Sequence, residues 1–164
     1  MPHEPPPAPF QAPPGAALGP PVMIALSGLF LAAFAAATVF PFQSEAVLAG
    51  LLVAATHPAA LLIAVATFGN VLGSVVNWVL GRYLLAFRDR RWFPASASQL
   101  DRAQAWYGRY GRWSLLGSWL PVIGDPLTVV AGLLREPLWS FLLLVTIAKG
   151  ARYLLLAAAT LVWL

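Results

Sequence analysis

The sequence predicts an all-α polytopic membrane protein built from two repeats, and three features of the 164-residue chain support this. Hydrophobic residues make up 60% of the chain, whereas charged residues make up only 10%. A soluble domain has about a quarter charged residues, so this chain has too few to cover a water-facing surface. The other two features are long segments almost free of charge and a proline-interrupted pattern that occurs twice.

The composition also excludes several kinds of site. The chain has no cysteine, which rules out disulfide frameworks and thiolate zinc sites, and its two histidines cannot form a histidine-rich metal cluster. The sequence contains no recognisable nucleophile–base pair and no phosphate-binding glycine loop. We therefore expect no enzymatic activity, no cofactor and no metal ion. The net charge of +4 comes from one basic segment, so we expect no nucleic-acid partner either.

Residues 1–21 hold nine of the fifteen prolines and predict a disordered, extended arm. The remainder, 22–164, is expected to form a single membrane domain. Within it we distinguish a first repeat at about 22–82, a cytoplasmic basic loop at 83–112 and a second repeat at about 113–164.

The first repeat is almost uncharged, since Glu45 is the only charged residue between positions 22 and 81. Pro41 and Pro58 divide it into three apolar pieces. At ~1.5 Å per residue, the first and third can cross a ~30 Å hydrocarbon core, while the second is too short and predicts a re-entrant half-helix. The pieces are Val22–Phe40, Ser44–Thr56 and Ala59–Leu80.

The segment 82–112 contains seven arginines and two aspartates, more net positive charge than the whole chain. A short basic loop between apolar segments stays in the cytoplasm. Ser98 and Asp101 fit a capping box, apolar residues follow at helical spacing, and Gly111 ends the pattern. We therefore expect a short helix on anionic lipid headgroups. The alternative is a solvated loop that only sets the topology.

The second repeat begins with an apolar run that Pro121 interrupts and in which Asp125 is the only charged residue. After a polar turn, the last 27 residues are apolar apart from Lys149 and Arg152. The length of this last run is sufficient for one membrane crossing.

Self-comparison of the chain indicates an internal duplication. FPFQSEAVLAG (40–50) is similar to LPVIGDPLTVVAG (120–132), so that Pro41 matches Pro121 and Glu45 matches Asp125. An Arg-Tyr pair follows each copy, beginning at Arg82 and at Arg152. Duplicated, proline-broken segments are typical of transporters whose site lies between inverted repeats.

Each proline is expected to end one half-helix, because proline removes a backbone donor and disfavours helix in the residue before it. Ser44 then suits the N-cap of a new helix. Asp125 suits the second N-cap, with Pro126 at the first helical position.

These motifs together resemble the DedA family, also called the SNARE-associated Golgi protein or VTT-domain family, and in particular its short YqaA-like bacterial branch. The resemblance covers about residues 22–160. It rests on PFQSE, GNVLGSVVNWVLGR (69–82), SWLPVIGD (118–125), the AG at 131–132 and KGARY (149–153).

The resemblance implies an inner-membrane protein with two re-entrant hairpins that face each other. It also implies movement of polyprenyl phosphate driven by the proton-motive force, or scrambling of phospholipids. Glu45 matches the acid of the family's first hairpin, and Arg82 and Arg152 match its basic positions. Ser118 and Gly124 stand where the family usually has arginine.

A charge at the bilayer centre costs ~2.5–3.5 kcal/mol on insertion scales, so the acids in the apolar segments require an explanation. In one hypothesis, Glu45 and Asp125 carry protons in a shared polar cavity, where Arg82 and Arg152 hold an anionic phosphate. In the other, the acids cap the half-helices and pair with the arginines, which only stabilises the fold.

A small, polar helix face, formed by Asn70, Gly73, Asn77 and Gly81, predicts close helix packing or, for the two asparagines, a cavity lining. The expected partners are anionic membrane lipids, protons and a second copy of the chain. The leading functional expectation is proton-linked translocation of an anionic lipid. The alternatives are a non-transporting membrane-organisation or assembly factor and a small-ion or solute transporter.

Overall fold

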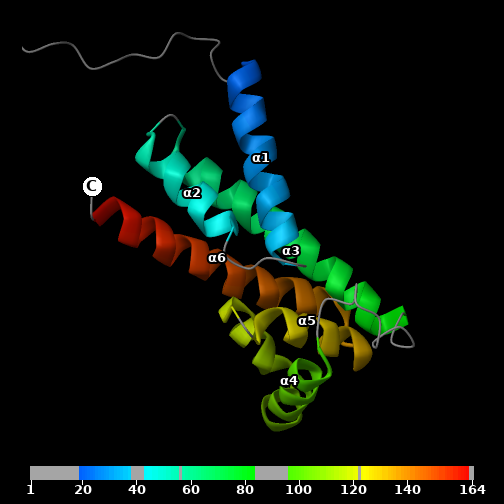
Figure 1. Ribbon diagram of the computed structural model, residues 1–164. Coiled ribbons are helices and arrows are strands. Elements are labelled where there is room, and N and C mark those ends of the chain that lie inside the picture. The colour runs from blue at the N-terminus through cyan, green and yellow to red at the C-terminus, as the bar shows by residue number, and fades with distance from the viewer. Residues whose placement is uncertain (1–18, 38–42, 56, 84–95, 122, 163–164) are drawn as a thin grey trace, which may run out of the picture.

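The computed structural model describes residues 19–37, 43–55, 57–83, 96–121 and 123–162, and all regular structure in these ranges is helical (Figure 1). The described elements are α1 (Pro20–Ala36), α2 (Gln43–Val53), α3 (Ala59–Tyr83), α4 (Ala97–Tyr110), the 3₁₀ helix η3 (Gly111–Trp119), α5 (Gly124–Leu133) and α6 (Leu138–Val162). The predicted all-α class is therefore confirmed for these ranges.

Two of the described helices, α3 and α6, are long and apolar enough to cross a membrane, and each has 25 residues. The expected crossing at Val22–Phe40 is not supported, because α1 has 17 residues and ends at Ala36. About 20 residues are needed for a full span. The predicted arm at 1–21 lies almost wholly outside the described residues. However, α1 begins at Pro20, since proline is tolerated in a first helical turn.

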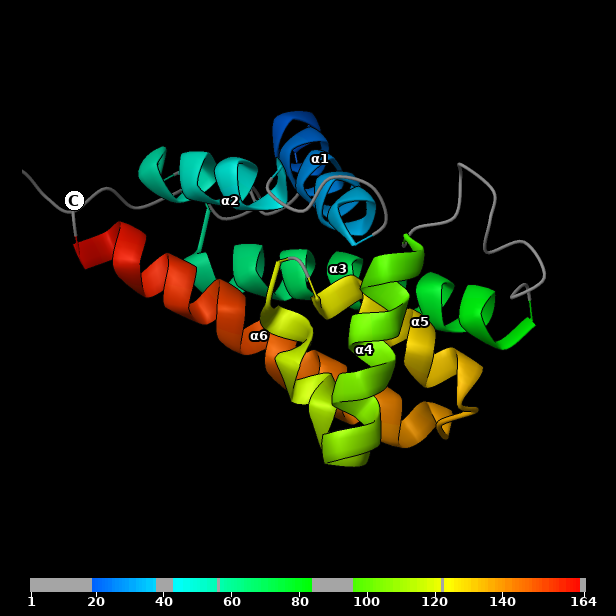
Figure 2. The same cartoon turned by 60° about the horizontal axis from the view of Figure 1, so that its bottom comes forward.

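The helices pack around the α3–α6 pair in a reciprocal arrangement (Figures 1 and 2). Helix α1 packs along α3, as η3 packs along α6. The short helices cross over, so that α2 packs on α6 and α5 packs on α3. Each half therefore places its short helix against the long helix of the other half.

Glycines allow the closest of these contacts. A side chain on Gly81 would collide with the backbone carbonyl of Val129, and one on Gly132 would collide with that of Trp78. Gly69 and Gly73 face the carbonyls of Phe30 and Phe34 on α1 in the same way. The small helix face predicted on α3 is therefore a packing face, as GxxxG sequences allow.

The match between Arg82 and Arg152 is wrong. Arg82 is the last residue but one of α3, whereas Arg152 is the fifteenth of the 25 residues of α6. When the two helices are aligned from their first residues, Asn70 corresponds to Lys149. The shared Arg-Tyr dipeptide misled the comparison because the two pairs lie at different depths in their helices.

Three predicted helix starts also differ from the structure. The capping box of α4 is formed by Ser96 and Gln99, not by Ser98 and Asp101. The Gln99 side chain reaches back to the Ser96 backbone, as the glutamate or glutamine of a capping box does. Gly111 does end α4, with φ of 57°.

Ser44 and Asp125 are not N-caps, because α2 begins at Gln43 and α5 at Gly124. Both side chains contact α6 instead.

Candidate functional site

One face of α6 collects the polar groups of both halves. Lys149, Arg152 and Tyr153 stand three and four residues apart, and this spacing places them on the same side of a helix. Lys149 and Tyr153 are almost fully buried, and the Arg152 side chain is 17% exposed. A lysine and an arginine in this setting require partners, since unpaired charges are costly away from water.

Arg152 joins the two halves of the molecule. Its Nε donates to Glu45 Oε1 at 2.6 Å, and a terminal nitrogen also pairs with that oxygen. Its other terminal nitrogen donates to the backbone carbonyl of Trp119 at 2.6 Å. That carbonyl belongs to the last residue of η3, just before the non-helical segment that separates η3 from α5. Arg152 therefore binds α2 of the first half and the helix break of the second half at once.

Lys149 forms the second ion pair of this face, with Nζ 2.9 Å from Asp125 Oδ1. The side chains of Lys149 and Asp125 are 4% and 19% exposed, so the pair is largely shielded from solvent. Lys149 was not among the site residues expected from the sequence. Its depth within an apolar helix was the signal for a site, since ionisable residues inside a membrane are usually functional.

A chain of hydrogen bonds lies next to the Arg152–Glu45 pair. The Asn70 amide donates to the Tyr153 hydroxyl at 2.8 Å, and that hydroxyl donates to Ser44 Oγ at 2.9 Å. Asn70 and Ser44 therefore belong to the network around the ion pairs. Asn77 does not, since its amide donates to the Ala37 carbonyl at 2.7 Å and satisfies the end of α1.

The buried polar atoms that have no hydrogen-bond partner among the described residues include Asn70 Oδ1 and Ser118 Oγ. An unsatisfied buried polar atom costs about 1–3 kcal/mol. Water is the usual partner of such atoms, so both mark places where water or a polar ligand group is favourable.

The second helix break is built around Pro121, as predicted, because η3 ends at Trp119 and α5 begins at Gly124. Gly124 lies against the Ser118 backbone carbonyl so closely that a side chain would collide with it. The glycine therefore has a packing role at this helix break. Pro41 and the first break lie outside the described residues.

The structure thus brings Glu45, Asp125 and Arg152 together through two α6 residues one turn apart. Arg82 is placed elsewhere, at the end of α3. Its guanidinium lies over the rings of Trp78 and Tyr83, at 4.9 and 5.8 Å from their centres. Cation–π contacts of this kind stabilise an arginine at the end of a helix. The residues that sequence reasoning missed are Lys149, Tyr153 and the Trp119 carbonyl.

Comparison with known proteins agrees with this architecture. The VTT domain matches residues 10–161. The chain belongs to the VTT-domain family. The resemblance to the DedA family is therefore confirmed. The matched residues include both ion pairs of this chain, the whole of α3 and all of α6 except its last residue. Since the family and the two apolar helices agree, this VTT-domain protein is a membrane protein.

Two relatives of known sequence illustrate the match. The inner membrane protein YqaA of Escherichia coli is 36% identical over 137 residues, which cover 84% of this chain and 92% of YqaA. An uncharacterized protein of Haemophilus influenzae is 35% identical over 135 residues, which cover 78% of this chain and 82% of that protein. No solved structure matches the chain.

Proposed function

We propose that this VTT-domain protein moves an anionic lipid, such as polyprenyl phosphate or a phospholipid, across the bacterial inner membrane. The observation that carries the proposal is the position of Arg152, bound both to Glu45 of one half and to the Trp119 carbonyl of the other. A guanidinium with this fork of donors also binds phosphate well. The inner membrane is suggested by the name of the Escherichia coli relative.

Protonation of Glu45 can change the partner of Arg152 from a carboxylate to a phosphate. When Glu45 takes up a proton, its carboxylate loses the charge that holds Arg152. The arginine is then free to bind a phosphate oxygen in place of the carboxylate. Release of the proton restores the ion pair and displaces the phosphate. The Asp125–Lys149 pair offers the same exchange one helical turn away. In this scheme the carboxylates and the lipid phosphate compete for the basic residues of α6, and protonation of a carboxylate favours the phosphate.

An inverted repeat with two re-entrant hairpins fits the packing. Tyr107 of the basic segment donates to Glu136 in the α5–α6 turn, so this turn and the end of α3 belong to the cytoplasmic side. α3 and α6 then cross in opposite directions. Because α1 runs parallel to α3, with Phe30 at Gly69 and Phe34 at Gly73, α1 begins on the outer side. It enters the membrane, and α2 returns to the same side.

A second candidate is a membrane-organisation factor that transports nothing. The observation in its favour is that both acids are already paired with basic residues, since paired charges also serve as structural links. Transport measurements on folded variants distinguish the two candidates.

The test is transport of a fluorescently labelled lipid phosphate by the full chain in liposomes, with and without a pH gradient. We expect wild-type protein to move the lipid and Glu45→Gln to abolish the dependence on the gradient. Arg152→Gln should lower the rate at least about tenfold, since a lost charge-assisted hydrogen bond costs roughly 1.5–3 kcal/mol.

Arg135→Gln is the matched control, because Arg135 is exposed in the α5–α6 turn, and this variant should transport normally. If wild-type protein moves no lipid under either condition, the proposal fails. If all variants fold and transport equally, the charged residues have only a structural role.

A further inference from the structure

The outer surface of η3 is organised by its 3₁₀ geometry. With three residues per turn, side chains three positions apart stand in one row. Trp113, Leu116 and Trp119 form such a row, and their exposed fractions are 62%, 38% and 45%. Ser114 and Gly117 form a neighbouring row with small side chains. The helix therefore presents an aromatic ridge beside a shallow floor.

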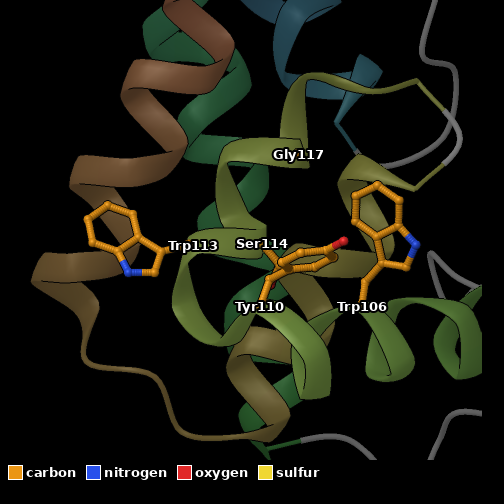
Figure 3. A pocket seen from close by; sticks show the side chains of 5 residues that line it. All are labelled: Trp106, Tyr110, Trp113, Ser114 and Gly117. Carbon is orange, nitrogen blue, oxygen red and sulfur yellow. The ribbon is translucent and has the colours of Figure 1, made fainter.

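A first groove lies between α4 and η3 and has a volume of about 280 Å³. It is lined by Trp106 and Tyr110 of α4 and by Trp113, Ser114 and Gly117 of η3 (Figure 3). The Tyr110 ring points toward Trp106, and their centres are 5.9 Å apart in an edge-to-face contact. The groove is thus apolar, with walls of indole and phenol rings.

The rim of this groove is cationic. The Arg109 guanidinium lies over the Tyr110 ring at 5.5 Å, and Arg112, which is exposed, directly precedes Trp113 in the chain. Tryptophan and tyrosine favour the level of the lipid headgroups, and arginine there attracts anionic lipid. A cationic rim over an apolar floor fits a phosphate with an attached hydrocarbon chain better than it fits a free phosphate.

A second groove, of about 210 Å³, lies between η3 and α6. Leu116 and Trp119 line it from η3, and α6 contributes the other side. Its α6 residues include Ala148 and Ala151, the neighbours of Lys149 and Arg152. The row Trp113–Leu116–Trp119 therefore leads from the cationic rim to the residue whose carbonyl binds Arg152.

We propose that these grooves hold one anionic membrane lipid, with its phosphate at Arg109 and Arg112 and a hydrocarbon chain along the η3 row. Charge complementarity and the continuous apolar row identify this occupant. This proposal rests on the proposed function in one respect: a lipid of the transported class is held at this site before it reaches Arg152. Binding is measurable without transport.

The experiment measures lipid retained by the detergent-purified full chain in native mass spectrometry, with dioleoyl phosphatidylglycerol, dioleoyl phosphatidylcholine or glycerol 3-phosphate added. Wild-type protein should retain phosphatidylglycerol in preference to both others. Arg109→Gln with Arg112→Gln should weaken that binding about tenfold or more, as expected for lost charge-assisted contacts. Trp113→Ala should weaken it, and Trp113→Phe should restore it.

Arg102→Gln is the matched control for Arg109→Gln, since each removes one charge from α4 and the two arginines lie two turns apart. Circular dichroism and elution volume establish that each variant is folded. Equal phosphatidylglycerol binding by the double variant and wild type overturns the site. Equal losses in Arg109→Gln and Arg102→Gln also overturn it, because the attraction is then diffuse.

The two proposals fail separately. Groove-dependent binding without any transport by wild-type protein refutes the proposed function and keeps the site. Transport by wild-type protein with binding unaffected by the groove variants refutes the site and keeps the function.

Discussion

At the scale of single residues, the main finding is that both acids of the apolar segments have basic partners on one helix. Glu45 and Asp125 were identifiable from the sequence because each is the only charged residue in its apolar segment. Their partners were not all identifiable, since sequence spacing does not show which charges meet across helices. Sequence similarity matched Arg82 with Arg152, whereas the structure places Arg82 near the end of α3, over the ring of Trp78.

The Asp125–Lys149 pair gives a test at this scale. Asp125→Asn alone should destabilise the protein by about 3–5 kcal/mol, because it leaves Lys149 buried without its counter-charge. Asp125→Asn combined with Lys149→Met should recover most of this loss. The measurement is the free energy of unfolding in detergent. A double variant as unstable as the single one would show that the pair does not account for the effect.

The same double variant bears on function. If the pair only stabilises the fold, a folded double variant transports lipid as wild type does. If the pair exchanges protons, the double variant folds and fails to respond to the pH gradient.

At the scale of elements, one buried face attaches α4 to the membrane helices. Leu100, Ala103 and Tyr107 are buried, and the Tyr107 hydroxyl donates to Glu136 Oε2 at 2.7 Å. Ser140 donates to the other Glu136 oxygen at 2.7 Å. Burial raises the pKa of the Tyr107 phenol well above its usual range, and the bond to Glu136 adds to the shift.

This shift predicts an alkaline limit for the attachment of α4. A raised phenol pKa means that the folded state favours the neutral hydroxyl. The stability it contributes is complete below the ordinary tyrosine pKa of about 10 and is lost as the pH rises above that value. Wild-type stability should therefore fall above about pH 10 by more than that of Tyr107→Phe.

At neutral pH, Tyr107→Phe should be less stable by about 1.5–3 kcal/mol, the range for a hydrogen bond to a charged group. Thermal unfolding followed between pH 7 and 11 measures both effects. Parallel pH profiles for the two proteins would contradict the role given to Tyr107.

The elements themselves were largely predictable, and their ends were not. Proline positions and apolar runs located α2, α3, α5 and α6 because proline breaks helices independently of tertiary context. The start of α4 was misplaced by two residues because two overlapping capping patterns are present in ASASQLD (95–101). The 3₁₀ form of η3 was not predicted from the sequence.

At the scale of the whole molecule, the reciprocal packing of the two halves was only partly predictable. The duplicated PFQSE and PVIGD segments indicated the repeat, whereas the crossing of each short helix to the opposite long helix required the structure. The crossing depends on Gly81 and Gly132. The sequence predicted close packing at Gly81 but did not show which helix packs there.

The topology is testable because the chain has no cysteine and needs no engineered background. A single cysteine at Gln104, on the exposed face of α4, should react with a membrane-impermeant maleimide only after the cells are opened. One at Ala54, in the exposed α2–α3 turn, should react from outside in intact cells. Reaction of both from the same side would contradict the proposed opposite orientation of the two halves.

The nine residues of η3 have a mechanical consequence. A 3₁₀ helix rises about 2.0 Å per residue and an α-helix about 1.5 Å, so relaxation of this segment to α geometry would shorten it by roughly 4–5 Å. Such a shortening, anchored at Gly111, would withdraw the Trp119 carbonyl from Arg152 and break their 2.6 Å hydrogen bond. A change in helical pitch near the membrane surface would thus remove one of the two partners of Arg152 in the interior and leave it bound to Glu45 alone.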